Sequence, residues 1–432
     1  MPQQFPRLLI LGETFRNDTG GGITLINLLN NWPKEQIAVI SDQSKYSSYA
    51  YKSSYYQLGE EEIRNKIFNR FIKSYGKSGI IRPSNNIIPP NSTKKYTKRP
   101  SFYTVSIKYC LTSLNIKCKI SNRLLKFIKH FNPEILYIQP NSIIYVLLAK
   151  NLLKEYTFKR VAIHFMDDFK FYYNFKRSLF LRLFYEWHLS ILRKIVDNTD
   201  RCFGISPKMC KEYSILFKKE FHSFHNPVRL SLWHEDQPIL KKIESNKIRI
   251  VYSGRIGVAN YNALNEIIDA LEEFNPKTST NYFLELYSPD KPKEIIEKIK
   301  QSKYISYEGF KSQEYIVERI KKSQIVLLPL SFDNEAIKRT YLSMPTKISE
   351  YLACSAAILV YAPSNTALVE YALSKQFGYV VQFKGIENII KGFVALSDKD
   401  LRSAYSEVAS KLAISTHSID IVTVDFEEKL LK

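Results

Sequence analysis

A single carboxylate, Glu350, stands near the start of a short helical segment in the stretch SMPTKISEYLACSAAILVYAP, residues 343–363. Pro345 suits the first turn of a helix, where its missing N–H group costs nothing. The amides of Thr346 and Lys347 then have no partner inside the helix, and such amides can hold a phosphate. A carboxylate one turn later can accept two hydrogen bonds from a vicinal diol such as a ribose. The stretch therefore predicts a site for a phosphate and a diol.

Three consecutive glycines, Gly20, Gly21 and Gly22, lie in the stretch GETFRNDTGGGI, residues 12–23. Glycine lets the backbone approach a ligand closely, and amides at the start of a helix favour an anion. The spacing is not the GxGxxG pattern of a dinucleotide site. The stretch is either a ligand-binding loop or a plain tight turn.

Arg255 follows Gly254 in the stretch YSGRIG, residues 252–257, directly after a predicted strand. A guanidinium group at the end of a strand suits a diphosphate, because its planar donors match phosphate oxygens. The alternative is a surface arginine after a turn.

Both halves of the chain alternate short apolar strands with helical segments, as in parallel sheets covered by helices on both faces. We predict an α/β protein with two Rossmann-like doubly wound domains that face a cleft. The predicted parts are a first domain at 1–230, a linker at 231–247, a second domain at 248–410, and a tail or helix at 411–432. A stretch rich in Pro, Asn, Ser and Lys at 80–101 predicts a long loop. Ligands in such sheets bind outside the carboxyl ends of the strands.

The net charge of +21 lies entirely in the first half of the chain. Residues 1–230 carry 37 Lys and Arg against 16 Asp and Glu, whereas residues 231–432 carry 26 of each. A field of one sign on one domain predicts an anionic partner, which is nucleic acid, an acidic membrane leaflet or a phosphorylated acceptor.

The five cysteines show neither a CxxC pair nor metal-ligand spacing, so we expect reduced cysteines in a cytoplasmic protein. The first residues lack the pattern of a signal peptide, and no run of 18 apolar residues predicts a membrane span.

The order of these motifs resembles that of glycosyltransferases with the GT-B fold, especially the large retaining group (group 1, or family 4-like) of bacterial polysaccharide enzymes. In the second half the resemblance rests on a strand followed by SGR, then EGF, VLLPLS and PTKISEYLACSAAILVYAP. In the first half it rests on the glycine loop, HF followed by MDDF, GIS and HNPV. It covers nearly the whole chain. It implies a hexosyltransferase-like enzyme that moves a sugar from a nucleoside-diphosphate sugar to a hydroxyl acceptor, with the acceptor on the first domain and the donor on the second.

The resemblance implies a role for each matching residue of the donor domain. Arg255 would bind the donor diphosphate, and the amides of Thr346 and Lys347 would bind its distal phosphate. Glu350 would hold the nucleotide ribose, and Phe310 lies where the base packs. For Glu350, the alternative is an exposed carboxylate favoured by the helix dipole.

In the first domain, the resemblance implies contacts with the sugar and the acceptor. His164, at the end of a strand, would contact the transferred sugar, and Gly20, Gly21 and Gly22 would face the sugar or the acceptor. A histidine on an otherwise apolar strand is also typical of a satisfied core residue.

Three positions depart from the family pattern. Leu342 stands where the family often has the first of two glutamates, and Asn260 stands where a basic residue is common. Lys338 or Arg339 would then supply the second positive charge. SAA, residues 355–357, replaces the usual GKP. These changes leave nucleotide binding in place and leave the sugar and the stereochemistry undetermined.

The expected reaction needs positive charge and oriented amides around the departing diphosphate. No carboxylate and histidine cluster with ligand spacing appears, so we expect neither a metal nor a cofactor. If configuration is retained, the leaving phosphate itself takes the acceptor proton. If it is inverted, Asp18, Asp167 or Asp168 must serve as the base. Asp167 and Asp168 could instead cap the next helix.

Residues 169–196 mix basic and bulky apolar side chains at helical spacing. This pattern predicts a surface that meets the anionic inner face of the cell membrane and a lipid-linked acceptor; the alternative is an ordinary core helix.

Other functions remain open: a sugar-nucleotide epimerase on the same fold, a non-catalytic relative, or a non-catalytic nucleic-acid-binding protein. No nucleic-acid recognition module is recognisable, so we expect no nucleic-acid partner.

Overall fold

The computed structural model of the chain describes residues 5–17, 19–42, 53–65, 75–81, 102–172, 178–233 and 247–432. Within these residues the chain forms two compact units. The first unit contains the residues up to His225 together with Asp425–Lys432, and the second unit spans Asn226–Val424. The chain therefore passes from the first unit to the second and returns at its end.

Four expectations fall partly or wholly on other residues. Asp18 lies outside the described residues, as do most of the loop predicted at 80–101 and most of the linker predicted at 231–247. The same holds for residues 173–177 of the stretch 169–196, which was predicted to meet a membrane.

The first unit is built on a sheet that is parallel apart from one edge. Its strands are β1 Leu8–Leu11, β2 Ile37–Ser41, β3 Ser54–Gln57, β5 Gly79–Ile81, β7 Ile135–Ile138, β8 Arg160–Phe165, β9 Arg201–Gly204 and β10 Phe221–Ser223. They are ordered β10-β9-β8-β7-β1-β2-β3-β5, and the pair β3 and β5 is antiparallel. A separate antiparallel pair joins β4 (Ile63–Asn65) to β6 (Ile116–Cys118).

The helices of the first unit are α1 Gly20–Leu28, α2 Phe102–Asn115, α3 Asn122–Phe131, α4 Ile143–Glu155, α5 Leu179–Asp197 and α6 Pro207–Phe217. The residue before each of the last four is a serine whose hydroxyl accepts a hydrogen bond from an amide of the first turn. This is the capping that the sequence encodes at helix starts. The end of α15 (Ile419–Leu431) also belongs to this unit, where the Phe426 ring lies 5.3 Å from that of Phe203.

The second unit is built on a sheet of parallel strands. Its strands are β11 Lys247–Ser253, β12 Asn281–Tyr287, β13 Ile305–Gly309, β14 Ile325–Pro329, β15 Ala357–Tyr361 and β16 Tyr379–Val381. The order β13-β12-β11-β14-β15-β16 is that of a Rossmann sheet, and every pairing is parallel. The carboxyl ends of these strands therefore meet at one edge.

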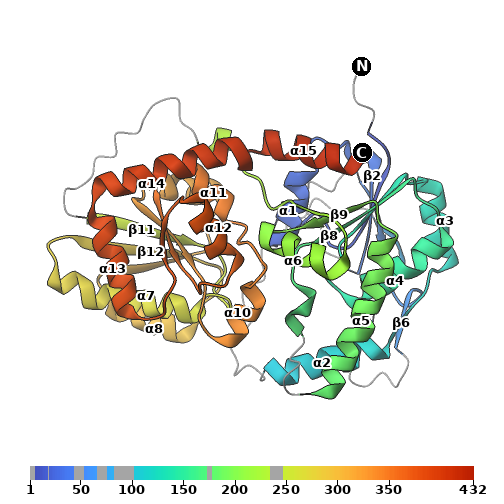
Figure 1. Cartoon of the computed structure of the whole chain (residues 1–432), viewed down its shortest axis with the longest axis horizontal. Helices are drawn as coiled ribbons and strands as arrows, with labels where there is room; N and C mark the ends of the chain where they lie inside the picture. Colours follow the sequence, from blue (N-terminus) through green and yellow to red (C-terminus); the bar gives the residue numbers. More distant parts are fainter. Residues whose placement is uncertain are drawn as a thin grey trace. The chain divides into compact units, whose positions relative to one another are not determined.

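Helices cover both faces of this second sheet (Figure 1). The helices are α7 Tyr261–Phe274, α8 Lys293–Gln301, α9 Gln313–Lys321, α10 Asn334–Thr340, α11 Ile348–Ala353, α12 Ala367–Lys375, α13 Ile386–Ser397 and α14 Lys399–Leu412. One core joins the sheet to α7, α8 and α13, and a second core joins it to α9, α11, α12 and α14. Neighbouring residues of β11, Ile250 and Val251, point into different cores because side chains alternate along a strand.

The predicted fold class, with two doubly wound Rossmann-like domains, is confirmed for both units. Within the described parts of the chain, no helix is long and apolar enough to cross a bilayer.

Candidate functional site

The predicted donor residues of the second unit lie around the carboxyl edge of its sheet. Arg255 follows β11, Phe310 follows β13, and Lys338 and Arg339 lie on α10, which follows β14. β11 is one of the two central strands, with β12 and β14 on either side. Such an edge is where open parallel sheets bind ligands.

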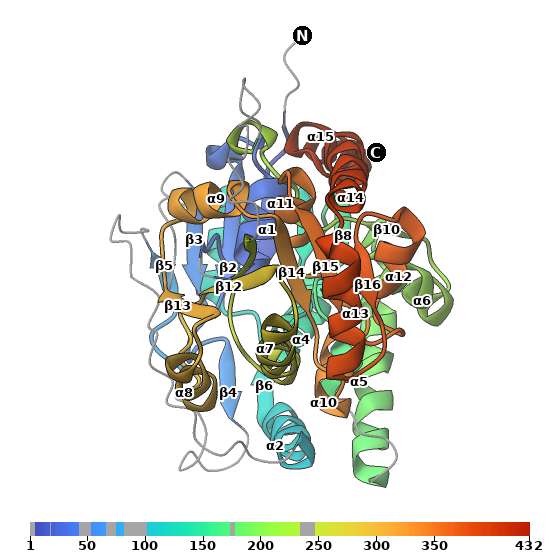
Figure 2. The ribbon, with the colours of Figure 1, turned by 90° about the vertical axis from the view of Figure 1, so that its left-hand side faces the viewer.

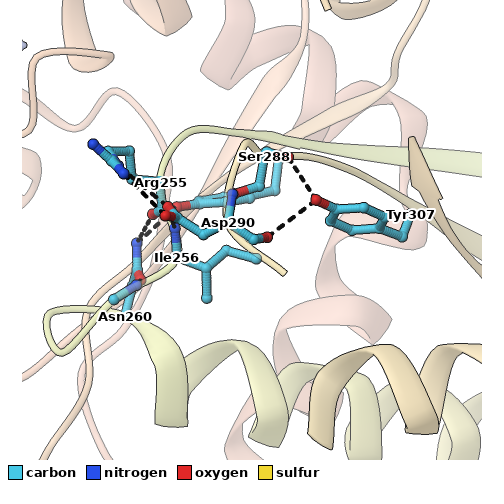
Figure 3. A network of polar contacts seen from close by, with 8 residues as sticks. Arg255, Ile256, Asn260, Ser288, Asp290 and Tyr307 are labelled. Atoms are coloured by element: carbon cyan, nitrogen blue, oxygen red, sulfur yellow. Dashed lines mark hydrogen bonds and ion pairs between the residues drawn. The ribbon is translucent and has the colours of Figure 1, made fainter. Parts of the chain in front are cut away.

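The side chain of Arg255 is paired with Asp290, which follows β12 (Figure 3). The Nη2 and Nε atoms of Arg255 donate to the two carboxylate oxygens at 3.0 and 3.3 Å. The amide of Ile256 donates to the same carboxylate at 3.0 Å. The Arg255 side chain is 66% exposed, whereas that of Asp290 is 16% exposed. Asp290 is therefore the less exposed partner of the pair, and Arg255 is the partner that faces solvent.

The backbone of Arg255 is also held from within its own loop. Its carbonyl oxygen accepts hydrogen bonds from the hydroxyl of Tyr252 at 2.7 Å and from Nδ2 of Asn260 at 3.0 Å. The oxygen of the Asn260 side chain accepts from the amide of Gly257 at 2.9 Å. Asn260, where the resemblance implies a basic residue, therefore fixes the shape of the loop.

Asp290 is held by the neighbouring strand ends. Its amide donates to the hydroxyl of Ser288 at 3.1 Å. The hydroxyl of Tyr307 donates its proton to the carbonyl oxygens of Ser288 and Asp290, which lie 2.7 and 3.1 Å away (Figure 3). Burial raises the pKa of Tyr307, which keeps that hydroxyl a donor. Sequence reasoning missed Asp290 and Tyr307. Asp290 could have been found from its position, because it lies in the loop after β12, and β12 is the neighbour of the strand that leads to Arg255.

The helix that carries Glu350 starts later than predicted. It begins at Ile348, and Pro345 lies in the preceding turn. The amide of Ile348 donates to the carbonyl of Pro345 at 3.1 Å, and the amide of Tyr351 donates to the carbonyl of Lys347 at 2.9 Å. The expectation of a helix from residue 345 is wrong, because a tighter turn closes on Pro345 before the helical bonds begin.

Lys347 and Glu350 form an ion pair across this turn. The Nζ atom of Lys347 lies 2.9 Å from Oε2 of Glu350, and both side chains are partly exposed. A diol bound by Glu350 would have to share the carboxylate with this ammonium group.

Tyr351 joins the start of α11 to the end of β11. Its buried hydroxyl accepts a hydrogen bond of 3.0 Å from the amide of Ser253, two residues before Arg255. The structure therefore brings together two motifs that lie almost 100 positions apart in the sequence.

The remaining predicted residues of the second unit surround these two motifs. Asp333 caps α10 through the amide of Ala336 at 3.0 Å, which positions the helix that carries Lys338 and Arg339. Phe310 is exposed, and Leu342 is fully buried. Leu342 is therefore a core residue, at the position where the resemblance implies a carboxylate.

The glycine run of the first unit forms the first turn of α1. Thr19 caps it by accepting from the amide of Gly22 at 3.1 Å and also donates to the carboxylate of Glu13. A Cβ atom on Gly21 would lie 2.0 Å from that carboxylate, and one on Gly22 would lie 2.4 Å from the carbonyl oxygen of Arg16. Gly22 is required by the close approach of the preceding backbone, whereas a Cβ atom on Gly21 would displace only the end of the Glu13 side chain. Their contact with a ligand stays a prediction.

His164 is fully buried at the end of β8. Its Nδ1 atom lies 2.5 Å from the hydroxyl of Tyr137, and its Nε2 atom lies 3.1 Å from the carbonyl oxygen of Phe224. Burial lowers the pKa of His164 to about 3, so the ring is neutral at neutral pH. This is the geometry of a satisfied core histidine, and the contact with a sugar predicted for it stays untested.

The two adjacent aspartates after β8 differ in environment. Asp168 is buried, and its Oδ1 atom accepts from the hydroxyl of Tyr213 at 2.8 Å and from the amide of Lys170 at 3.0 Å. Burial raises the pKa of Asp168. Asp167 is exposed. The hydrogen bond to Lys170 is the capping contact considered as the alternative to a catalytic role.

Among the described residues, no group of three His, Cys, Asp or Glu could hold a metal ion. The expectation that the protein works without a metal and without a cofactor stays a prediction.

Comparison with known proteins identifies similar folds and no similar sequence. No protein-family model and no curated protein matches the chain. Sucrose-phosphate synthase from Thermosynechococcus elongatus is 9% identical, with 98% of each chain covered and a TM-score of 0.61. HepE of Anabaena, solved in complex with UDP, is 11% identical over 98% of this chain and 99% of that chain, with a TM-score of 0.61.

A third similar structure is WaaG, a glycosyltransferase involved in lipopolysaccharide biosynthesis. It is 11% identical, covers 98% of this chain and 99% of that chain, and has a TM-score of 0.56. The likeness extends over both units in each case, which confirms the predicted resemblance at the level of the fold. The chain has the two-domain GT-B fold of glycosyltransferases.

Proposed function

We propose that the protein is a glycosyltransferase that moves a sugar from a nucleoside-diphosphate sugar to a hydroxyl acceptor. The observation that carries this proposal is the junction of the Arg255 loop and α11 at the carboxyl edge of the second sheet, through Tyr351 and Ser253. Guanidinium and backbone donors there match a diphosphate. The nearby carboxylate of Glu350 matches the diol of a ribose.

In this proposal the donor lies along the carboxyl edge of β11, β13 and β14. Arg255 binds the diphosphate, with Lys338 or Arg339 as the second cation, and the amides of Thr346 and Lys347 bind the distal phosphate. Glu350 holds the ribose. The exposed ring of Phe310 stacks on the base.

Bond cleavage places negative charge on the departing diphosphate, and fixed cations and amides stabilise that charge. In a retaining reaction the leaving phosphate takes the acceptor proton. In an inverting reaction Asp167 is the better placed of the two described aspartates, because it is exposed, whereas Asp168 is buried and hydrogen-bonded.

UDP sugars are the first donors to test, because HepE of Anabaena was also solved with UDP-glucose. Thermal shift with UDP, GDP, ADP and their hexose conjugates should show a rise in Tm for one nucleotide, since a ligand that binds only the folded state stabilises it. Absence of any shift at millimolar nucleotide would contradict the proposal.

Product analysis then separates the alternatives. A transferase releases the nucleoside diphosphate only with a glycosylated acceptor, whereas an epimerase releases an altered sugar without one. Binding without turnover would identify a non-catalytic relative, a possibility kept open by Leu342.

We further propose that the acceptor is carried by a lipid, as in surface polysaccharide or glycoconjugate synthesis, and that the first unit meets an anionic membrane. Helices α2 and α5 lie side by side in both views (Figures 1 and 2), with the Tyr109 and Phe184 rings 6.4 Å apart. Leu179 and Leu183 of α5 are 71% and 62% exposed, and Leu111 of α2 is 56% exposed.

Basic residues accompany these apolar side chains. Lys108 on α2 and Arg182 on α5 are exposed, with Glu186 as an exposed acidic neighbour one turn further along α5. Apolar side chains that enter the interface, together with cations that meet anionic headgroups, are the features of a helix lying on a membrane. The large positive charge of residues 1–230 adds long-range attraction.

A further inference from the structure

Asp290 holds Arg255 in one orientation. The carboxylate meets the guanidinium group through Nε and Nη2. Because the guanidinium group is planar and rigid, this contact turns its other edge, which carries Nη1, away from Asp290. An arginine that is 66% exposed would otherwise sample many rotamers.

The carboxylate that does this is itself fixed at several points. Its Oδ2 atom also accepts from the amide of Ile256, so the contact includes the backbone of the Arg255 loop. The hydroxyl of Ser288 accepts from the amide of Asp290, and the hydroxyl of Tyr307 donates to the carbonyl oxygens of both Ser288 and Asp290 (Figure 3). Residues from the loops after β11 and β12 and from β13 itself therefore contact a single acidic residue.

The loop of Arg255 is held on its other side as well. The carbonyl oxygen of Arg255 is bound by Tyr252 and Asn260. The side chain and the backbone of this arginine are thus both fixed before any ligand arrives. Preorganisation of this kind improves binding because the ordering cost has already been met.

We propose that Asp290 is a positioning residue of the donor site, which orients Arg255 so that its Nη1 edge meets the diphosphate. This inference rests on the proposed function. A carboxylate beside an anion site would by charge alone weaken diphosphate binding. The proposal instead expects the loss of Asp290 to weaken it.

The test is a double-mutant cycle on nucleoside diphosphate affinity, measured by calorimetry with UDP, GDP and ADP on the full chain. Asp290→Ala should weaken binding of the preferred nucleotide about three- to tenfold. The same change should have little further effect in the Arg255→Ala background, because two residues that act through one contact are coupled. If Asp290→Ala only disturbed the fold, the loss of nucleotide affinity would be the same in the wild-type and the Arg255→Ala backgrounds.

Two further variants complete the experiment. Asp269→Ala is the matched control, since Asp269 pairs with Lys298 at 2.7 Å in the same unit, between α7 and α8, and its removal should leave nucleotide affinity unchanged. Asp290→Asn keeps an acceptor for the amide of Ile256, so it should fold and show an intermediate loss.

The outcomes separate the two proposals. Tighter or unchanged nucleotide binding by Asp290→Ala, or an equal loss in both backgrounds, would overturn the positioning role and leave the proposed function standing. If Asp290→Ala does not fold, unchanged binding by Asp290→Asn would overturn the role. Failure of the wild-type chain to bind UDP, GDP or ADP would count against the proposed function itself.

Discussion

The side-chain amide of Asn226 donates a hydrogen bond of 3.2 Å to the carbonyl oxygen of Thr346. That carbonyl and the amide of Lys347 belong to the same peptide group, and in a trans peptide the two point in opposite directions. Asn226 therefore fixes the direction of the Lys347 amide, although it lies 120 positions earlier and is the first residue of the second unit.

Asn226→Ala should lower the affinity for a nucleoside diphosphate about tenfold and leave the affinity for the monophosphate almost unchanged. The reason is that a released Thr346–Lys347 peptide no longer presents its amide to the distal phosphate, and a hydrogen bond to a charged group contributes about 1.5–3 kcal/mol. Calorimetry with both nucleotides measures the difference.

The matched control is Asn275→Ala. Asn275 is also a buried asparagine of the second unit, and its Nδ2 atom donates to the carbonyl of Tyr282 at 2.9 Å, near the start of β12. It should lower the free energy of unfolding without affecting the preference for the diphosphate. If Asn226→Ala and Asn275→Ala had the same effect on the preference for the diphosphate over the monophosphate, the role of Asn226 would be refuted.

Glu350→Ala should weaken nucleotide binding about tenfold or more while the fold survives. The variant removes the acceptor proposed for the ribose diol, and hydrogen bonds to a charged group are among the stronger ones. Binding of the 2′,3′-dideoxynucleotide, which lacks the diol, should respond much less than binding of the ordinary nucleotide. Calorimetry with both compounds makes the comparison.

Glu318→Ala provides the control for Glu350. Glu318 also pairs with a lysine at an end of its own helix, Lys322 at 3.5 Å, which directly follows α9. Glu318→Ala should leave the affinities for the ordinary nucleotide and for the 2′,3′-dideoxynucleotide unchanged. Unaltered donor affinity in Glu350→Ala would remove this residue from the site.

The stability of the protein should fall as the pH is lowered from 7 toward 4. Burial lowers the pKa of His164 to about 3 and that of His188 to about 4, from ordinary values near 6.5. Below pH 6.5 the unfolded chain therefore binds protons that the folded chain does not. Each histidine then contributes up to about 1.4 kcal/mol of lost stability per pH unit.

Calorimetric unfolding of the wild type and of His164→Gln between pH 7.5 and 4.5 tests this expectation. The variant should be less stable at pH 7.5, because it loses the contacts to Tyr137 and Phe224. The difference in Tm from the wild type should narrow as the pH falls. A difference that does not change with pH would show that His164 is protonated equally in both states.

The double variant Leu179→Ser, Leu183→Ser should reduce binding to anionic vesicles severalfold, because two apolar side chains no longer enter the interface. Sedimentation with phosphatidylglycerol-rich vesicles at low salt measures this, and raising the salt should weaken the binding of the wild type. Ile215→Ser is the control, since Ile215 is an equally exposed residue of α6 in the same unit. Wild-type protein that stays in the supernatant at low salt would exclude a membrane role.

Local sequence patterns determined most of the fold. The strands at β11, β12, β14 and β15 are near-continuous apolar runs, so their burial on both faces followed from composition alone. Serine caps marked the starts of several helices. The strands β4 and β5 were missed because three residues are too few to show a pattern, and α10 was missed because it has only seven residues.

The sequence also determined which residue types stand at the strand ends, and hence Arg255, Thr346, Lys347 and Glu350 as candidates. Only the tertiary structure decided their partners. Asp290 contacts Arg255 from the end of another strand, and Asn226 contacts Thr346 from the start of the second unit. Tyr351, on the helix that carries Glu350, contacts Ser253 at the end of the strand before Arg255. Such contacts depend on the order of the strands in the sheet, because that order decides which residues become neighbours, however far apart they lie in the sequence. The burial of His164 is of the same kind, because the atoms that satisfy it come from β7 and from the segment after β10.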